Sequence, residues 1–359
     1  MRYRAVLVTD AGGCVARQLT VSLLNTGHSV RGTVDPSEDA DGLKAILSQY
    51  APVDALEYVP ADFAADAGWA GAMDGMDAVI IPASPLPTEV GHSRAALVNG
   101  AVSAILRVLN IARASGLTRI IVASSTSAIV GGHVRDAEAG TRFNPFTEAD
   151  WSDLASGRLS AGQEARTRAE LAVWDFAMNF AEMGISVINA GKVFGPVIGE
   201  ASAGGGTGLI RRLMAGEYRD LPRIGFEGID VRDLADLYLR VLGNDLSIGN
   251  RYVATAGFLW LEDVAQLLST EFQGHAGRVC RRTAPDIVLR LRAVFDGTAS
   301  RAVPDLGHYA PCSPARAWQD LGWRPRSATD AVRSTAQSLI AAGLVERDIP
   351  HEHLSASPA

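Results

Sequence analysis

Short apolar runs that alternate with helix-length stretches are the feature that most constrains this chain. The first run, residues 3–9, ends in a turn of small residues, and a helical pattern and a second run over 29–34 follow. This is the pattern of a strand–helix–strand unit. Further apolar runs, most of them separated by helix-length segments, follow at 55–59, 78–82, 119–123 and 185–189. Such alternation predicts an α/β fold with a doubly wound parallel sheet and helices on both of its faces.

The turn after the first run has the chemistry of a phosphate-binding loop. It reads TDAGGCVA over residues 9–16 and leads into the first helical pattern. Unpaired backbone N–H groups and the helix dipole attract an anion to such a turn, and glycines let the anion approach closely. We therefore expect Gly12, Gly13 and Val15 to contact the pyrophosphate of a dinucleotide.

Asp10 is the unusual residue of this turn. A carboxylate about 5 Å from a pyrophosphate would cost roughly 3 kcal/mol per unit charge at an effective dielectric constant of about 20, or about a hundredfold in affinity. The side chain would escape this cost by turning outward. An alternative interpretation is that Asp10 caps the following helix through its carboxylate oxygen, which requires no ligand.

The regular alternation loosens beyond residue 195 into glycine-rich turns and short elements. We expect a nucleotide-binding domain over residues 1–195, to which parts of 225–260 return. A smaller C-terminal α/β cap is expected mainly over 196–350. Residues 351–359 are small and polar, which predicts a flexible tail.

Seven ordered motifs resemble segments of one enzyme family. They are NTGHSVRGTV (25–34), Ala-Ser-Pro (83–85), FTEADW (146–151), VFGP (193–196), DVRDLAD (230–236), RYVATAGFLW (251–260) and LGWRPRS (321–327). With the glycine turn, they resemble extended short-chain dehydrogenases/reductases of the NAD-dependent epimerase/dehydratase superfamily, in the branch of dihydroflavonol reductases and aldehyde reductases. The resemblance implies a Rossmann domain that binds NAD or NADP, a substrate pocket between this domain and the cap, and hydride transfer to a carbonyl.

The pair of residues that handles the proton in that family is replaced in this chain. The family pattern places a tyrosine and a lysine four residues apart on one helix face, so that the ammonium lowers the pKa of the phenol. Alignment on Ala169-Glu170 puts Gly162 at the tyrosine position and Arg166 at the lysine position. The usual proton donor is therefore absent, although Arg166 keeps a positive charge that could hold a ribose hydroxyl.

The serine side of the family's site is retained. Ser125 and Thr126 follow the apolar run 119–123, where the family has its catalytic hydroxyl. A hydroxyl-rich strand end could instead satisfy backbone groups without any catalytic role. The nearest polar replacements for the tyrosine are Gln163 and Glu164. The candidate catalytic residues are therefore Ser125, Thr126, Glu164 and Arg166.

Asp35 follows the second apolar run at the distance typical of an acid that binds the adenosine ribose, which favours NAD over NADP. Arg31 could argue for NADP, and Asp35-Pro36-Ser37 could simply form a turn. Asp62 matches the family position beside the adenine, or it caps a helix within 64–73. By resemblance, the expected cofactor contacts are Asp10, Gly12, Gly13, Val15, Arg31, Asp35, Asp62, Ala83, Ser84 and Val193.

Composition excludes several other classes of function. The net charge of -7 is spread along the chain, without a basic block that could bind nucleic acid. The three cysteines and seven histidines show no metal-ligand spacing, so we expect no metal. No signal peptide or membrane-spanning apolar run is recognised, and we expect a cytoplasmic protein without membrane partners.

The sequence leaves three functions open. The favoured one is an atypical family member that acts on a small carbonyl or hydroxyl compound with altered, even non-redox, chemistry. The second is an NAD(P)H-dependent carbonyl reductase with a substitute proton donor, and the third is a non-catalytic protein that binds or senses a dinucleotide. Dinucleotide binding is expected to be weakened or lost, and the resemblance implies a homodimer formed through the helices within 101–114 and 165–183.

Overall fold

A computed structural model describes residues 3–83, 93–133, 144–199, 204–287 and 303–347. Its larger sheet has seven parallel strands in the order β3-β2-β1-β4-β5-β6-β9. The strands are β1 (Ala5–Val8), β2 (Ser29–Val34), β3 (Leu56–Pro60), β4 (Ala78–Ile81), β5 (Arg119–Ser125), β6 (Gly184–Ala190) and β9 (Arg251–Ala254). The predicted Rossmann-type, doubly wound parallel sheet is confirmed.

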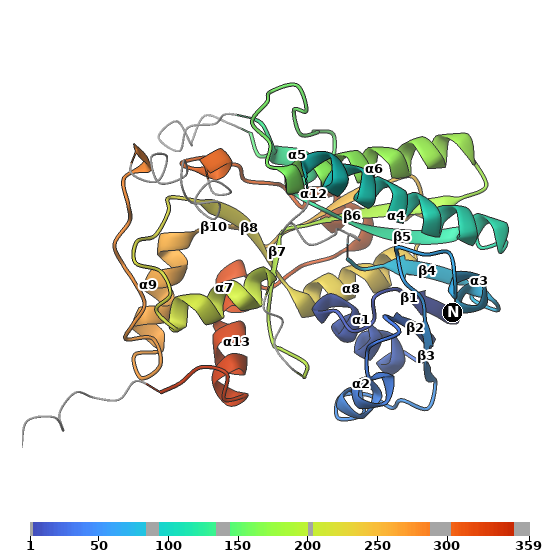
Figure 1. Ribbon diagram of the computed structural model, residues 1–359, viewed down its shortest axis with the longest axis horizontal. Coiled ribbons are helices and arrows are strands. Elements are labelled where there is room, and N and C mark those ends of the chain that lie inside the picture. The colour runs from blue at the N-terminus through green and yellow to red at the C-terminus, as the bar shows by residue number, and fades with distance from the viewer. Residues whose placement is uncertain (1–2, 84–92, 134–143, 200–203, 288–302, 348–359) are drawn as a thin grey trace, which may run out of the picture.

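Helices cover both faces of this sheet (Figure 1). One face carries α1 (Cys14–Asn25) and α8 (Val231–Leu242), and the other carries α3 (Trp69–Met73), α4 (Arg94–Ala114) and α6 (Ala161–Asn179). The remaining helices of this part are α2 (Ala40–Leu47), α5 (Ser127–Val130) and α12 (Ala315–Leu321). Strands such as β4, whose four residues are all buried, read as continuous apolar runs because helices cover both of their sides.

The cap is a second, smaller layer built around a three-stranded sheet. Its strands are β7 (Lys192–Phe194), β8 (Gly225–Asp230) and β10 (Phe258–Trp260), in the order β10-β8-β7. The helices α7 (Gly205–Met214), α9 (Leu261–Glu271) and α13 (Ala328–Ala341) pack with it around a separate apolar core. Figure 1 shows this layer beside the carboxyl ends of β5 and β6, with β7 joining the two parts.

Helix α4 is long and apolar enough to cross a membrane by length and composition alone. The sequence expectation that no segment reaches this length therefore does not hold by that measure. Its packing accounts for the apolar side chains, because Ile105, Val108 and Leu109 share a buried cluster with Val173 and Phe176 of α6. An apolar helix is the expected result where a helix is buried against a sheet and a neighbouring helix.

A buried ion pair joins the last strand of the sheet to α6. The Arg251 Nε donates to Glu170 Oε1 at 2.6 Å, and both side chains are almost completely buried. Asn189 also donates to Glu170, at 2.6 Å, and the Ser124 hydroxyl donates to the same carboxylate. The Arg251 guanidinium lies 3.8 Å from the centre of the Trp151 ring. This network fixes the carboxyl ends of β5 and β6 relative to α6.

Replacing Arg251 with methionine should lower the free energy of unfolding by about 3–5 kcal/mol, because it leaves the Glu170 carboxylate buried without a counter-charge. Denaturant unfolding measures the effect. The matched control is Arg168→Met, which removes an exposed ion pair with Glu164 on the same helix and should cost less than about 1 kcal/mol. Equal losses in the two variants would contradict a structural role for the buried pair.

Candidate functional site

The main cavity lies where the carboxyl ends of the strands meet the cap. It has a volume of about 670 Å³. Its walls come from Cys14 and Val15 at the start of α1, the ends of β4, β5 and β6, the start of α6, and β7, β8 and α7 of the cap. The residues predicted from sequence that line it are Val15, Ala83, Ser125, Thr126, Arg166 and Val193. This is the crevice in which open α/β sheets bind ligands.

The glycine turn holds Asp10 in the left-handed region, at a φ of 50°. Its backbone N–H donates to Thr33 Oγ1 at 3.1 Å, and its carbonyl accepts from the Gly13 N–H at 2.9 Å. Gly13 is the N-cap residue of helix α1, and no side chain caps this helix. The alternative interpretation of Asp10 as a helix cap is therefore wrong, and the first N–H groups of α1 carry no side-chain partner.

Glu38 is a second carboxylate at this turn, and the sequence interpretation missed it. Its Oε1 lies directly over Gly12, in the space that a Cβ atom would occupy, and its Oε2 accepts from the Asp35 N–H at 3.1 Å. Burial, and then the negative charge of Glu38, raise the pKa of Asp10 to about 6. The only available signal was the position of Glu38, in the loop after the second strand that also carries Asp35.

A dinucleotide fits the scaffold here but meets an electrostatic cost. The uncapped N-terminus of α1 has no acidic residue in its first turn, and Cys14 and Val15 open onto the cavity. These features suit a pyrophosphate. The carboxylates of Asp10 and Glu38 oppose it because they lie at the glycines that would receive it.

The side chains expected around the adenosine are engaged in local contacts. Asp35 is exposed, and its Oδ1 accepts from the Ser37 N–H at 2.8 Å and from the Ser37 hydroxyl at 2.5 Å, bonds that lower the pKa of Asp35. Arg31 instead pairs with Glu57 and donates to three carbonyls around α3. Asp62 accepts from the Ala64 N–H at 2.9 Å in a turn, well before α3 begins. Ser84 lies outside the described residues.

The predicted catalytic residues divide into two groups. Ser125 lines the cavity, and its Oγ accepts from the backbone N–H and the hydroxyl of Ser127, at 3.2 and 3.0 Å. Thr126 and Arg166 line the same cavity. Glu164 does not, because its carboxylate forms ion pairs with Arg94 at 2.6 Å and Arg168 at 2.8 Å, which lower its pKa. The position of Gly162 is buried within the start of α6.

Several polar groups of the cavity come from the cap or from far along the chain. Gln163 caps α6 together with Ser160, and its amide donates to Asp305 Oδ1 at 2.9 Å. Burial raises the pKa of Asp305, and burial raises that of Glu227 to about 7. Glu227 accepts from the Cys312 N–H at 2.7 Å and from the Thr255 hydroxyl. Lys192, on β7, supplies an ammonium group. Sequence reasoning missed Asp305, Glu227 and Lys192 as site residues because none of them lies in a motif that it singled out.

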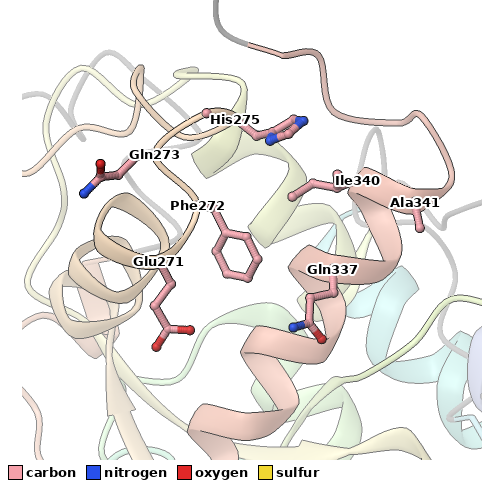
Figure 2. A pocket seen from close by; sticks show the side chains of 8 residues that line it. Glu271, Phe272, Gln273, His275, Gln337, Ile340 and Ala341 are labelled. Carbon is pink, nitrogen blue, oxygen red and sulfur yellow. The ribbon is translucent and has the colours of Figure 1, made fainter.

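A second hollow, of about 410 Å³, lies on the cap between the end of α9 and α13 (Figure 2). Phe272 and Ile340 form part of its wall, and His275 stands at its rim. Its carboxylate, Glu271, is ion-paired with Arg333 at 2.6 Å. This hollow lies away from the carboxyl ends of the large sheet, so we assign the functional site to the main cavity. Among the described residues, no cluster of three or more potential metal ligands is found.

Comparison with known proteins agrees with this arrangement. The model of the NAD dependent epimerase/dehydratase family matches residues 6–254, which span the large sheet from β1 to β9. The chain belongs to this family. The resemblance to extended short-chain dehydrogenases/reductases seen in the sequence motifs is thereby confirmed.

Individual members of the epimerase/dehydratase family resemble the chain at modest identity. It is 25% identical to cinnamoyl-CoA reductase CAD2 of Medicago truncatula, over 68% of this chain and 74% of that protein. It is 24% identical to the NADPH-dependent methylglyoxal reductase GRE2 of Saccharomyces cerevisiae, over 77% and 84%. The structure of yeast Gre2 with NADPH has the same fold, with a TM-score of 0.75 at 21% identity over 94% of this chain and 99% of Gre2.

The Asp10 carboxylate predicts that dinucleotide affinity depends on pH. Its pKa of about 6 means that charge accumulates as pH rises through this value, so wild-type affinity should fall between about pH 5 and 7.5. Asp10→Asn keeps the side chain's size and its tolerance of a positive φ. It should bind about tenfold more tightly at pH 7.5 and lose the pH dependence, as measured by calorimetry. Asp41→Asn, on the exposed side of α2, is the control. Identical curves for Asp10→Asn and wild type would show that the carboxylate does not face the ligand.

The raised pKa of Glu227 predicts that the free energy of unfolding depends on pH. The folded protein holds this proton up to about pH 7, whereas an unperturbed glutamate loses it near 4.5. The stabilisation by the neutral carboxyl is thus fully present below pH 4.5 and is lost as pH rises through 7, on the order of 3 kcal/mol. Glu227→Gln should flatten urea-unfolding stability between about pH 5 and 8. Glu262→Gln, at the exposed start of α9, should leave the wild-type slope unchanged, and a wild-type slope in Glu227→Gln would refute this assignment.

Proposed function

We propose that the protein is a dinucleotide-binding enzyme of the epimerase/dehydratase family that acts on a small carbonyl or hydroxyl compound without the usual tyrosine–lysine pair. The observation that carries this proposal is the main cavity, which joins the uncapped start of α1 to Ser125, Thr126 and Arg166 in one space. Because Gly162 stands where the family has its tyrosine, the proposed reaction needs another group to transfer the proton.

The chain's own residues suit the binding of a substrate oxygen. Ser125 accepts two hydrogen bonds from Ser127, and its own hydroxyl hydrogen has no acceptor among the described residues. That hydrogen is therefore available to a substrate oxygen in the cavity. Arg166 lines the same cavity and supplies a fixed positive charge. A reduced nicotinamide, when bound, would supply the hydride.

NAD is the proposed dinucleotide in preference to NADP. The carboxylates of Asp35 and Glu38 lie in the loop after β2, where each would repel the extra phosphate of NADP. Arg31, the residue that could have favoured NADP, is occupied by Glu57 and by backbone carbonyls. Relatives include NADPH-dependent enzymes, so this preference is a point on which the chain is proposed to differ from them.

Calorimetric titration with NAD⁺, NADH, NADP⁺ and NADPH tests the proposal directly. We expect micromolar binding of the NAD forms and at least tenfold weaker binding of the NADP forms at pH 7.5. Glu38→Gln should narrow this difference because it removes one repelling charge, whereas Asp54→Asn, at an exposed position before the amino end of β3, should not. No binding of any form at millimolar concentration would reject a dinucleotide enzyme and would favour a cofactor-free reaction or a binding protein.

Two further expectations remain proposals. The protein is proposed to be cytoplasmic, and to form a homodimer through the outer faces of α4 and α6. The exposed Met178 on α6 is consistent with such a contact, because three-quarters of its side chain meets solvent in the single chain.

A further inference from the structure

Lysine is nearly absent from this protein. Of its 33 basic residues, only Lys44 and Lys192 are lysines, and the remaining 31 are arginines. Lys44 lies on α2 and donates to the Leu56 carbonyl at 2.7 Å. Lys192 lies in the wall of the main cavity. Lys192 is therefore an amine side chain in a cavity of a protein whose other basic side chains, apart from Lys44, are guanidinium groups.

The backbone places Lys192 next to the hydroxyl side of the site. Ser125, at the end of β5, pairs in register with Ala190 of β6, and the Thr126 N–H donates to the Ala190 carbonyl at 3.0 Å. Lys192 follows two residues later, which is roughly 7 Å along an extended chain. A lysine side chain of about that length can reach the space in front of the Ser125 hydroxyl.

The surroundings of Lys192 leave its ammonium available. Within the described parts of the chain it has neither a hydrogen-bond acceptor nor a carboxylate at ion-pair distance, and its Nζ lies over the Phe226 ring, 5.2 Å from the ring centre. The charged groups that face it are Arg166 from α6, Arg212 from α7 and Asp305 from the turn at 303–305. The carboxyl of Glu227, on β8, lines the same cavity.

We propose that Lys192 is the catalytic proton donor of this site, and that its Nζ hydrogen-bonds to the carbonyl oxygen of the substrate and then protonates it. The inference rests on the proposed function and deepens it. In the step, the ammonium gives one proton to the carbonyl oxygen while the carbonyl carbon gains a hydride from a reduced dinucleotide. The alcohol leaves, and the neutral amine regains a proton from solvent.

The chemistry of the two cations supports this division of roles. A guanidinium does not lose its proton in proteins, so Arg166 can fix charge but cannot act as an acid, whereas a buried lysine shifts its pKa readily. Burial is the largest cause that lowers the pKa of Lys192, and Arg166 and Arg212 lower it further against the opposing effect of Asp305. A lowered pKa brings an ammonium closer to the range in which general acids are efficient.

Amine labelling tests Lys192 without reference to catalysis. The intact protein is treated with a limiting acetylating reagent over a pH series, and mass spectrometry follows both lysines, with Lys44 correcting for reagent dose. Lys192 should reach half-maximal labelling at a pH below the ordinary lysine pKa of 10.5. Bound NADH together with acetophenone should slow its labelling. A titration of Lys192 at the ordinary value would overturn the proposal.

Kinetics with acetophenone and isovaleraldehyde as probes give the second test. Lys192→Met should lower kcat at pH 7 by about a hundredfold or more, with the NADH dissociation constant unchanged. Lys192→Arg should keep the charge but remain as slow, and Lys44→Met should match wild type. The wild-type rate should fall as pH rises through the lowered pKa of Lys192, and this limb should vanish in Lys192→Met.

The outcomes separate this proposal from the proposed function. Absence of dinucleotide binding would reject the proposed function itself. Dinucleotide binding with wild-type rates in Lys192→Met, or binding without reduction of either probe by the wild-type protein, would overturn proton donation by Lys192 alone. A Lys192 adduct trapped by borohydride would also overturn it, because the amine would then act as a nucleophile rather than as an acid.

Discussion

The buried pair of Glu170 and Arg251 is the constraint on which the site depends. It joins α6 to β9, and the same carboxylate accepts from Ser124 and Asn189 at the ends of β5 and β6. Removing two charges from water is favourable only where such hydrogen bonds complete the pair. The pair therefore fixes the strand ends and the helix between which the cavity opens, and with them the positions from which a hydroxyl and an ammonium can meet a substrate.

The glycine turn and the cavity beside the cap have opposite electrostatic character. At the glycine turn, Asp10 and Glu38 present carboxylates to backbone N–H groups that would otherwise attract an anion. Toward the cap, Arg166 and Lys192 bring positive charge to a space that Asp305 and Gln163 also border. The carboxylates at the turn would oppose a diphosphate, whereas the cations of the cavity would favour development of negative charge on a substrate oxygen. The proposed changes in cofactor affinity and in chemistry therefore depend on different groups of residues.

Local sequence patterns predicted the sheet and the glycine turn, because these depend on neighbours along the chain, and the family resemblance predicted Ser125, Thr126 and Arg166, which line the cavity. The sequence-based predictions failed for side chains whose position depends on their direction around a helix or on contacts with residues far along the chain. Residue 166 is about 40° from residue 162 around a helix, whereas residue 164 is about 200° away, so Glu164 faces α4 instead of the cavity. Arg31 is drawn to α3 by carbonyls about 40 residues away. The contact between Gln163 and Asp305 spans 142 residues, which no local pattern can reveal.

The replacements on α6 and the lysine on β7 form a consistent set. In the family pattern, a lysine at position 166 lowers the pKa of a tyrosine phenol at position 162. Without that phenol, a lysine at 166 would have no such role. Arginine at 166 instead provides a charge that does not titrate, and that charge acts on Lys192 by favouring its neutral form. In both arrangements a cation lowers the pKa of a neighbouring proton donor. In this chain the cation lies on α6 and the proposed donor on β7, whereas in the family pattern both lie on one helix face. In this proposal no tyrosine at position 162 competes as an acid, and the proton donor lies on strand β7 instead of helix α6.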